Sequence, residues 1–272
     1  MTSSTEAPRV ITEIEGPVAR VWLNRPDKLN GLDLDLIEEL AAAAKSLSRN
    51  TAVRVVVIEG RGDAFCAGLD FAAAAKESKL RILRMALPNP FRGTNAFQEC
   101  FWAWRNLPMP VIAVTRGHVL GGGIQLALAC DFRFSTPDCR WSVLEAKWGL
   151  IPDMTGTIPL GELVGADVAK RLTMTGEIIS GEQAHAYGLV TGVDAAPEKL
   201  AQELIDAIIA RSPDSVAASK RLLNLAQHGS IRSALSRERW FQLAMFRTKN
   251  ATIARKAGMA GETPKFGPRV FK

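Results

Sequence analysis

Three consecutive glycines, Gly121 to Gly123, open an apolar helix-like run in the stretch GHVLGGGIQLALACD. The first residues of a helix present backbone N–H groups that have no partner inside the helix and carry partial positive charge. Glycine permits a positive φ before the helix begins and lets a ligand approach the backbone closely. The run is therefore a candidate site for an anion or for the oxyanion of a reaction intermediate. Close packing between a helix and a strand would explain the glycines equally well.

A second small-residue turn, Ala67-Gly68 in FCAGLD, follows another strand-like run. Two loops that each leave a parallel-type strand could direct two backbone N–H groups at one carbonyl oxygen. That arrangement stabilises an enolate or a tetrahedral oxyanion, and loss of one such donor typically costs about 3 kcal/mol. The dinucleotide pattern G-x-G-x-x-G does not fit GHVLGGGIQ, and the phosphate-loop ending Gly-Lys-Ser/Thr is absent.

One carboxylate, Glu145, lies in the apolar segment WSVLEAKWGLI. This setting predicts partial burial, which would raise its pKa and suit it to proton transfer near neutral pH. A surface position is the alternative. Asp153 follows a proline, where an aspartate usually caps a turn. Four other polar residues are expected to be structural or at the surface: Asp70, Asp131, His118 and His185.

The elements that must position these residues alternate between strands and helices. Residues 10–24 alternate apolar and polar side chains around a Gly-Pro turn, which predicts a β-hairpin, and residues 33–48 have helical apolar spacing. Residues 53–60 and 109–117 are predicted to form buried strands, with a further short strand at 132–136. Because the strand–loop–helix unit occurs twice, the sequence predicts a repeating α/β scaffold.

The rest of the chain is predicted to be mainly helical. In residues 72–105 a helix is expected, broken by LPNPFRG, and the chain is mostly helical after about residue 160. Residues 231–257 are predicted to form one amphipathic helix long enough to reach a neighbouring subunit. They carry a cluster of large apolar side chains that calls for a partner surface: Trp240, Phe241, Leu243, Met245 and Phe246. We expect an α/β core in residues 1–200 and a helical oligomerisation region in residues 201–272.

Composition limits the classes of function. The 272 residues, 47% of them hydrophobic, suit one large domain or a domain with an appendage. The net charge of +6 suits an anionic partner, but a merely basic surface explains it equally well. Because the Lys and Arg residues are scattered, a phosphorylated small ligand fits as well as nucleic acid, and we expect no nucleic-acid partner. The four cysteines show no C-x-x-C pair and no His at metal spacing, so neither a disulfide framework nor a metal site is expected. A signal-like start and an 18-residue apolar run are both lacking, which predicts a cytoplasmic protein without a membrane span.

Several segments together resemble the enoyl-CoA hydratase/isomerase (crotonase) family. They are LNRPDKLNGL, VRVVVIEGRGDAFCAGLD, PVIAVTRGHVLGGGIQLALACDFRFS, SVLEAKWGLIPDMTGTIPL and ISGEQAHAYGLV, in this order, and the similarity runs from about residue 10 to residue 225. The resemblance implies a crotonase-like fold of repeated ββα units that acts on acyl-CoA thioesters. It also implies a trimer or a dimer of trimers, and no cofactor, since coenzyme A is part of the substrate.

The resemblance also assigns roles to particular positions. The two oxyanion donors would be the backbone amides of Leu69 and Gly122. The adenine and phosphate end of coenzyme A would lie near the two segments KLN and AFCAG, that is, near Lys28, Leu29, Ala64, Ala67 and Gly68. The basic C-terminal tail KFGPRVFK is an equally good partner for the phosphates.

The acids depart from the pattern of the family. Family hydratases hold two glutamates near the reacting carbons; Glu145 matches one of them, and Gln125 stands where the other would be. A Gln side chain does not exchange a proton at neutral pH, although it can hold a water or a substrate oxygen. Asp153 lies eight residues after Glu145, as in the dienoyl-CoA isomerases of the family. Those isomerases also carry an acid at the position of Gln125, so the match is partial.

These features favour an enzyme that forms a thioester enolate, in fatty acid degradation, with a double-bond shift slightly preferred over hydration. A single carboxylate can take a proton from one carbon and return it to another when the enolate is stabilised. A true hydratase that uses Glu145, with Gln125 positioning the water, is the alternative. A non-catalytic acyl-CoA-binding protein is a third reading, but it would need neither Glu145 nor Asp153.

Overall fold

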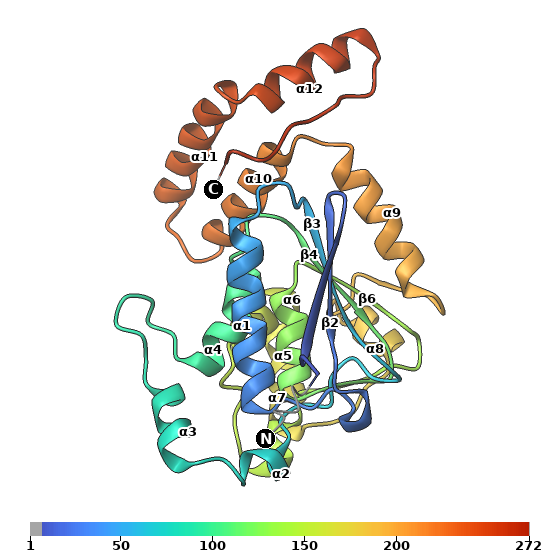
Figure 1. The fold of residues 1–272 in the computed structure, drawn as a ribbon, viewed down its shortest axis with the longest axis vertical. Coiled ribbons are helices and arrows are strands. Elements are labelled where there is room, and N and C mark those ends of the chain that lie inside the picture. The colour runs from blue at the N-terminus through green and yellow to red at the C-terminus, as the bar shows by residue number, and fades with distance from the viewer. Residues whose placement is uncertain (1–6, 272) are drawn as a thin grey trace, which may run out of the picture.

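The computed structural model describes residues 7–271, which form a central β-sheet with helices on both of its faces (Figure 1). The polar start of the sequence, where no signal segment was expected, lies largely outside the described residues, as does Lys272. No helix in the described part of the chain is long and apolar enough to cross a membrane.

The central sheet has six strands in the order β1-β2-β3-β4-β6-β8. These are β1 Val10–Glu15, β2 Val18–Leu23, β3 Val55–Gly60, β4 Val111–Thr115, β6 Phe132–Ser135 and β8 Gly192–Val193. Only β1 and β2 pair antiparallel, around Gly16 at φ +56°, which confirms the predicted hairpin. A separate parallel pair, β5 His118–Leu120 and β7 Arg140–Ser142, lies beyond the end of β4.

Both faces of the central strands β3 and β4 are buried, as their continuous apolar runs predicted. In β3, Val56 and Ile58 pack into the main core, while Val55 and Val57 face the opposite side and pack against α9, Pro197–Ile209. The first face is covered chiefly by α1, Leu34–Arg49, and α4, Ala96–Arg105 (Figure 1). A strand enclosed on two sides has no polar face, which is why its sequence does not alternate.

Helix α1 begins where its sequence provides a cap. The side chain of Asp33 accepts the Leu36 N–H at 2.8 Å, and the apolar face of the helix, including Leu36, Ile37 and Leu40, is buried. This confirms the helix predicted at residues 33–48. In the segment that gave an ambiguous pattern, three helices occur: α2 Phe71–Ala74, α3 Lys79–Ala86 and α4. The LPNPFRG stretch separates α3 from α4, as expected.

The middle of the chain contributes short helices around the functional loops. These are the 3-10 helices η1 Pro26–Lys28 and η2 Leu144–Trp148, and the α-helices α5 Gly122–Ala129, α6 Thr157–Leu163, α7 Ala166–Thr175 and α8 Gly181–Ala186.

The C-terminal helices are α10 Pro213–Ala226, α11 Ile231–Phe246 and α12 Lys249–Ala260, which lie at one end of the sheet (Figure 1). The single helix predicted over residues 231–257 is therefore wrong. Thr248 stops it, because its hydroxyl accepts the Ala251 N–H and starts a new helix. The expected boundary at residue 200 falls inside α9, whose residues Ala201 and Ile205 pack on the sheet. The division into two regions stays a prediction.

Candidate active site

The glycine run forms the start of α5. Gly121 is the N-cap residue, with φ +52° and ψ −120°, and every residue of α5 is buried. A Cβ on Gly123 would lie 2.3 Å from the Cys66 carbonyl oxygen, so this glycine permits close packing. Gly122 is the first residue of the helix, where a backbone N–H has no partner within the helix. The glycine run thus allows close packing at Gly123 and also leaves the backbone N–H of Gly122 without a partner inside the helix.

The other loop, residues 65–70, lies between two neighbouring segments. Leu32 and Leu69 form an isolated parallel bridge in which the Leu32 N–H donates to Gly68 O and the Asp70 N–H donates to Leu32 O. In such a bridge the hydrogen bonds flank the central residue, so the Leu69 N–H points away from Leu32. A second bridge joins Cys66 to Val119 on the other side.

The two loops and Glu145 meet at one place. A Cβ on Gly68 would lie 2.8 Å from Leu120 O and 3.6 Å from the Gly121 Cα. A Cβ on Gly121 would lie 3.7 Å from Glu145 Oε1. The structure therefore brings the Leu69 loop, the glycine run and the candidate acid together, although they are far apart in the sequence.

Glu145 lies in the first turn of η2, and its side chain is buried, with 9% of the residue exposed. Its Oε1 accepts a hydrogen bond from Gln125 Nε2 at 2.6 Å, whereas Oε2 is buried and has no partner among the described residues. Burial raises the pKa of Glu145, and the nearby charge of Asp153 raises it further. The predicted burial is confirmed, and one carboxylate oxygen is available for proton transfer.

Gln125 uses both ends of its amide, and only 1% of the residue is exposed. Its Oε1 accepts the N–H groups of Met154 at 2.9 Å and Gly156 at 3.0 Å, while its Nε2 donates to Glu145. Between these two amides Thr155 has φ +74°, a conformation that is costly for a β-branched residue. Gln125 therefore holds a strained turn and orients Glu145, and its oxygen is occupied and so is not free to accept from a water.

Asp153 belongs to the same turn, and its side chain is exposed. It influences Glu145 through charge, since it raises the pKa of that carboxyl. Asp70 and Asp131 have the structural roles that we expected. Asp70 caps α2, and Asp131 pairs with Lys220 Nζ at 2.6 Å. His185 Nδ1 lies 2.8 Å from Val190 O, as a structural histidine would.

The residues expected near coenzyme A lie in two adjoining loops. Lys28 and Leu29 are exposed at the end of η1, and Ala67 and Gly68 lie in the loop that precedes Leu69. Ala64 is an exception. Its side chain is in the core with 1% exposed, and its carbonyl accepts from Asn30 Nδ2, so a contact through its side chain is not available to a ligand.

The C-terminal tail lies away from this region within the same chain. The Arg269 N–H donates to Thr51 O, and Asp214 Oδ1 accepts the N–H groups of Val270 and Phe271. Thr51 follows the C-terminal end of α1, whereas the site lies beyond its N-terminal end. Sixteen residues of α-helix separate them by roughly 24 Å. The tail is therefore not a phosphate partner for the site in its own chain.

Sequence reasoning missed Asn30, which joins the two loops expected near coenzyme A through hydrogen bonds. The residue is fully buried and has φ +55°. Its Oδ1 accepts the Arg25 N–H, and its Nδ2 donates to the carbonyls of Arg61 and Ala64. The dipeptide Asn30-Gly31 was the available signal, because Asn tolerates a positive φ in turns.

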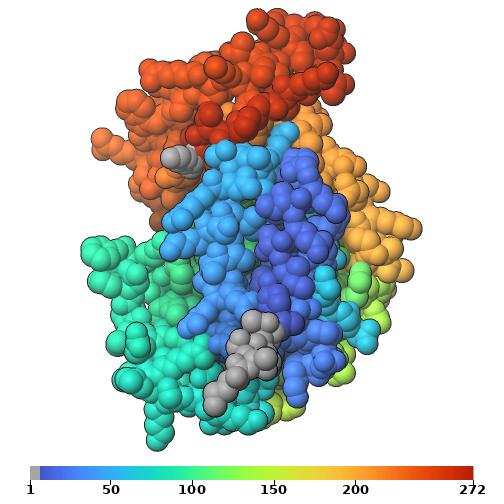
Figure 2. Space-filling view, in the orientation of Figure 1, coloured from blue at the N-terminus to red at the C-terminus, as the bar shows by residue number. Residues whose placement is uncertain are grey.

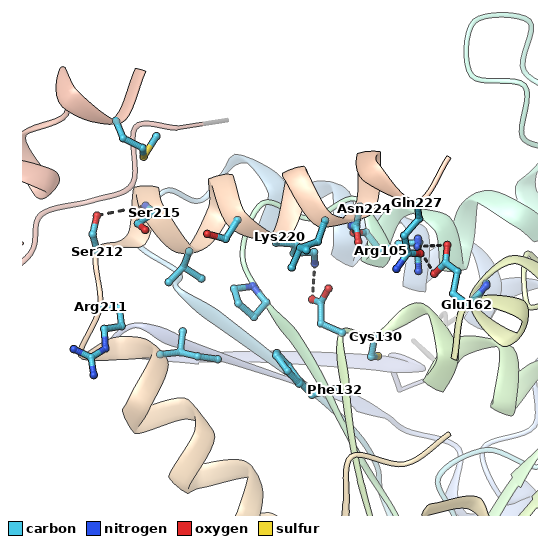
Figure 3. A pocket seen from close by; sticks show the side chains of 18 of the residues that line it. Arg105, Cys130, Phe132, Glu162, Arg211, Ser212, Ser215, Lys220, Asn224 and Gln227 are labelled. Atoms are coloured by element: carbon cyan, nitrogen blue, oxygen red, sulfur yellow. Dashed lines mark hydrogen bonds and ion pairs between the residues drawn. The ribbon is translucent and has the colours of Figure 1, made fainter. Parts of the chain in front are cut away.

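A separate cavity of about 850 Å³ lies between the core and the C-terminal helices (Figure 3). Helix α10 borders it with Lys220 and Asn224, and Gln227 follows the helix; beside Gln227 lies Glu162, which pairs with Arg105. Glu145 is not among its lining residues. In residues 7–271 no three His, Cys, Asp or Glu side chains are grouped as a metal ion would require.

Comparison with known proteins gives several extensive matches. A family model described as enoyl-CoA hydratase/isomerase matches residues 13–267. A short-chain-enoyl-CoA hydratase of Clostridium acetobutylicum is 31% identical over 236 residues, covering 86% of this chain and 87% of the relative. The peroxisomal Delta(3,5)-Delta(2,4)-dienoyl-CoA isomerase of Arabidopsis thaliana is 28% identical over 259 residues, covering 93% of each. A crystal structure of an enoyl-CoA hydratase from Bacillus anthracis has a TM-score of 0.86 at 29% identity, covering 95% of this chain and 98% of that one.

Proposed function

Because this chain belongs to the enoyl-CoA hydratase/isomerase family, we propose that it shifts a double bond in unsaturated acyl-CoA thioesters through a stabilised enolate. Members of the family act on acyl-CoA substrates, and the crotonase-like fold expected from the sequence is confirmed. The proposal places the reaction in fatty acid degradation in the cytoplasm.

One observation carries the choice of reaction: Glu145 is a buried carboxylate that lies beside the glycine run with one oxygen unpartnered, whereas the other buried carboxylate near the Leu69 loop, Asp33, is engaged as the cap of α1 and by Arg25. The unpartnered Oε2 of Glu145 takes a proton from the substrate carbon next to the thioester. The electrons move into the thioester oxygen, which the N–H groups of Leu69 and Gly122 stabilise. The same carboxyl then returns the proton to a carbon further along the chain, which moves the double bond. The protonated Glu145 formed in between suits a buried group with a raised pKa.

Asp153 has two possible parts in this scheme. Its exposed charge raises the pKa of Glu145, which favours a carboxyl that alternates between acid and base. It could also carry the proton at the second carbon. Replacement by Asn separates these roles: a modest loss of rate supports electrostatic tuning, and a loss as large as that of Glu145→Gln supports a second proton carrier.

Hydration of a 2-enoyl-CoA is the second candidate, and the similarity to hydratases such as that of Clostridium acetobutylicum favours it. Glu145 would then have to activate the water and also protonate the α-carbon. Gln125 would contribute only the second N–H of its Nε2, because its oxygen is engaged by Met154 and Gly156. A non-catalytic acyl-CoA-binding protein is disfavoured, since a buried carboxylate with an unpartnered oxygen lowers stability without aiding binding.

We also propose that the chain assembles as a trimer or as a dimer of trimers. Helix α11 has no buried residue in the single chain, and Trp240, Leu243 and Phe246 on it are exposed. Large apolar side chains gathered on one helix favour contact with another subunit. Sedimentation at micromolar concentration tests this proposal, and a stable monomer would contradict it.

The decisive experiment offers the purified enzyme a panel of 2-enoyl-, 3-enoyl- and dienoyl-CoA thioesters and identifies the products by mass and NMR. Isomerisation leaves the mass unchanged and moves the double bond, whereas hydration adds the mass of one water. We expect 3-enoyl- or dienoyl-CoA to be converted faster than water is added to 2-enoyl-CoA. Rapid hydration that persists in Glu145→Gln would overturn the single-base mechanism.

Gln125→Glu sharpens the choice between the two reactions. A glutamate there can still accept the two backbone N–H groups, but its second oxygen would face Glu145 Oε1 at about the 2.6 Å now spanned by the amide. Two carboxylates so close share one proton, as an acid–base pair would require. We expect water addition to 2-enoyl-CoA to rise above the wild-type rate.

A further inference from the structure

Arg25, in the loop between β2 and η1, makes three side-chain contacts around the Leu69 loop. Its Nη2 lies 3.0 Å from Asp70 Oδ2 and 3.3 Å from Asp33 Oδ2, and its Nη1 donates to Gly31 O. The side chain is only 12% exposed. One guanidinium thus joins two carboxylates and a backbone carbonyl.

The two carboxylates occupy equivalent positions. Asp33 directly follows Leu32, and Asp70 directly follows Leu69, the two residues that form the parallel bridge. Each aspartate also caps a helix: Asp33 accepts from the first turn of α1, and Asp70 accepts the Ala73 N–H at the start of α2. Arg25 therefore ties together the two helix starts that lie on either side of the bridge.

We propose that Arg25 is a positioning residue that holds the Leu69 N–H at the oxyanion site. This inference rests on the proposed function, in which that N–H stabilises the thioester enolate. Arg25 touches no reacting atom in the proposal. It acts through Asp70 and Asp33, which fix the register of the segment that carries Leu69.

The Leu69 loop needs such a support because little else anchors its far end. Helix α2 has only four residues and none of them is buried; the ring of Phe71 contacts that of Trp148 at 4.9 Å between centroids, but both rings are exposed, so packing holds the helix weakly. On the other side, the bridge to Leu32 contributes two backbone hydrogen bonds. Displacement of a donor by about 1 Å can cost on the order of 10²-fold in rate. The planar guanidinium of Arg25 contacts both aspartates, so it limits sliding of the Leu69 segment along the Leu32 segment. The point charge of a lysine would restrict this motion less.

The pair Arg20 and Glu59 provides a matched control. Arg20 lies in β2 and Glu59 in β3, their side chains are 2.9 Å apart, and both are partly buried. This pair joins two neighbouring strands of the same sheet, and its ion pair lies outside the loops expected near coenzyme A and the Leu69 loop. Removal of Arg20 therefore reports the cost of losing an ion pair without moving the Leu69 N–H.

The kinetic test compares Arg25→Ala with Arg20→Ala, at a temperature where circular dichroism shows both to be folded. On the best substrate of the panel, we expect Arg25→Ala to lower kcat by roughly 10- to 10²-fold, with little change in acetyl-CoA affinity. Arg20→Ala should leave kcat near the wild-type value. Free guanidinium ion, below concentrations that shift the melting temperature, should partly restore Arg25→Ala and leave Arg20→Ala unchanged. An unchanged kcat in folded Arg25→Ala, or losses that are equal in the two variants, would overturn the proposal.

A double-variant cycle asks whether Arg25 acts through Asp70. Asp70→Asn keeps the helix cap, because Asn caps as well as Asp, but removes the charge that Arg25 holds. If the two residues act as one device, the double variant falls little further than Arg25→Ala alone. Fully additive losses would contradict this route.

Hydrogen exchange provides a test that does not need turnover. Peptides that cover residues 66–75 should exchange faster in Arg25→Ala than in the wild type, and should not in Arg20→Ala. If the wild type converts no thioester but exchange increases in Arg25→Ala as expected, the proposed function is wrong, and the positioning of the Leu69 loop by Arg25 is supported. If the wild type turns over a thioester but Arg25→Ala changes neither the exchange nor kcat, the positioning role of Arg25 is wrong and the proposed function is unaffected.

Discussion

In the proposed mechanism the two loops of the oxyanion site share one task, but they are held in place by different forces. The glycine run at the start of α5 is fixed by close packing, since a side chain at Gly123 would collide with the backbone of Cys66. The Leu69 loop shares this packed contact through Cys66, but its far end is held by polar side chains. The Arg25–Asp70 ion pair lies at its rim, and Asn30 Nδ2 donates to the carbonyl of Ala64 just before it. All of α5 is buried, whereas the short α2 that follows Leu69 has no buried residue.

This difference predicts how the geometry of each loop should respond to substitution and to pH. A loop held by packing has no room for an added methyl group, but its geometry does not depend on charge. A loop held by ion pairs and hydrogen bonds tolerates added volume at the surface, but it responds to loss of a charge and to pH. Substitutions in the two loops should therefore differ in kind as well as in size.

The largest expected effect comes from Glu145, the group that contacts the glycine run. Glu145→Gln should lower turnover by roughly 10²- to 10⁴-fold, the range for loss of a general base. The same change should stabilise the protein at neutral pH. The folded-state pKa of Glu145 is raised, so its stabilising contribution is present at low pH and is lost as the pH rises through that value. Thermal melts across pH would show a gain in the variant that vanishes in acid; a variant less stable than wild type at neutral pH would contradict this.

Gly122 tests the backbone donor of the packed loop. Gly122→Pro removes the N–H at the first helical position, where proline is compatible with helix geometry. We expect a loss of about 10²- to 10³-fold in kcat, the range for one oxyanion donor. Gly122→Ala is the control, since it adds a Cβ of similar position, 2.5 Å from the flexible Leu32 Cδ1, but keeps the N–H. Equal losses in both variants would assign the effect to crowding.

Gly123 tests the packing itself. A methyl group there would lie 2.3 Å from Cys66 O and 2.9 Å from its Cβ, so the strand or the helix must move. Gly123→Ala should lower the free energy of unfolding by about 1–3 kcal/mol or more, as overpacking does. Gly258→Ala in α12, where a Cβ would meet nothing within 4 Å, should instead be neutral or stabilising. Urea unfolding measures both, and similar values would refute the contrast.

The smallest effect is expected at Asp70, in the polar loop. Asp70→Asn keeps the cap and loses the ion pair, which should cost roughly 0.2–1 kcal/mol at neutral pH. The Ala73 N–H and then Arg25 lower the pKa of Asp70. Its contribution is therefore present above the ordinary carboxyl pKa and is lost as the pH falls through the lowered value. Urea unfolding of both proteins should show the difference shrinking in acid; a constant difference would show that the charge is not responsible.

The elements that depend on local pattern were predictable. The hairpin, the buried strands β3 and β4, and helix α1 each follow from the periodicity of apolar residues, and the burial of Glu145 followed from its apolar neighbours. The two glycine loops were found because their small residues follow strands.

Contacts between distant polar residues were not predictable in the same way. Arg25 and Asp70 are 45 residues apart, and Gln125 reaches a turn some 30 residues further on. No local spacing encodes which partner a side chain finds across the fold. The interruption at Thr248 was missed because the apolar periodicity continues through it, although a threonine can cap a helix wherever the chain bends.

The amide of Gln125 has a consequence for how the rate should depend on acidity. Its nitrogen can donate to Glu145 Oε1 whether that carboxyl is charged or neutral, and its oxygen holds the Met154 and Gly156 amides in either state. Where two hydrogen-bonded carboxyls would release their protons in two linked steps, this pair has one proton to give. The basic form of Glu145 is then produced by a single ionisation, and the turn from Met154 to Gly156 keeps the same hydrogen bonds before and after it.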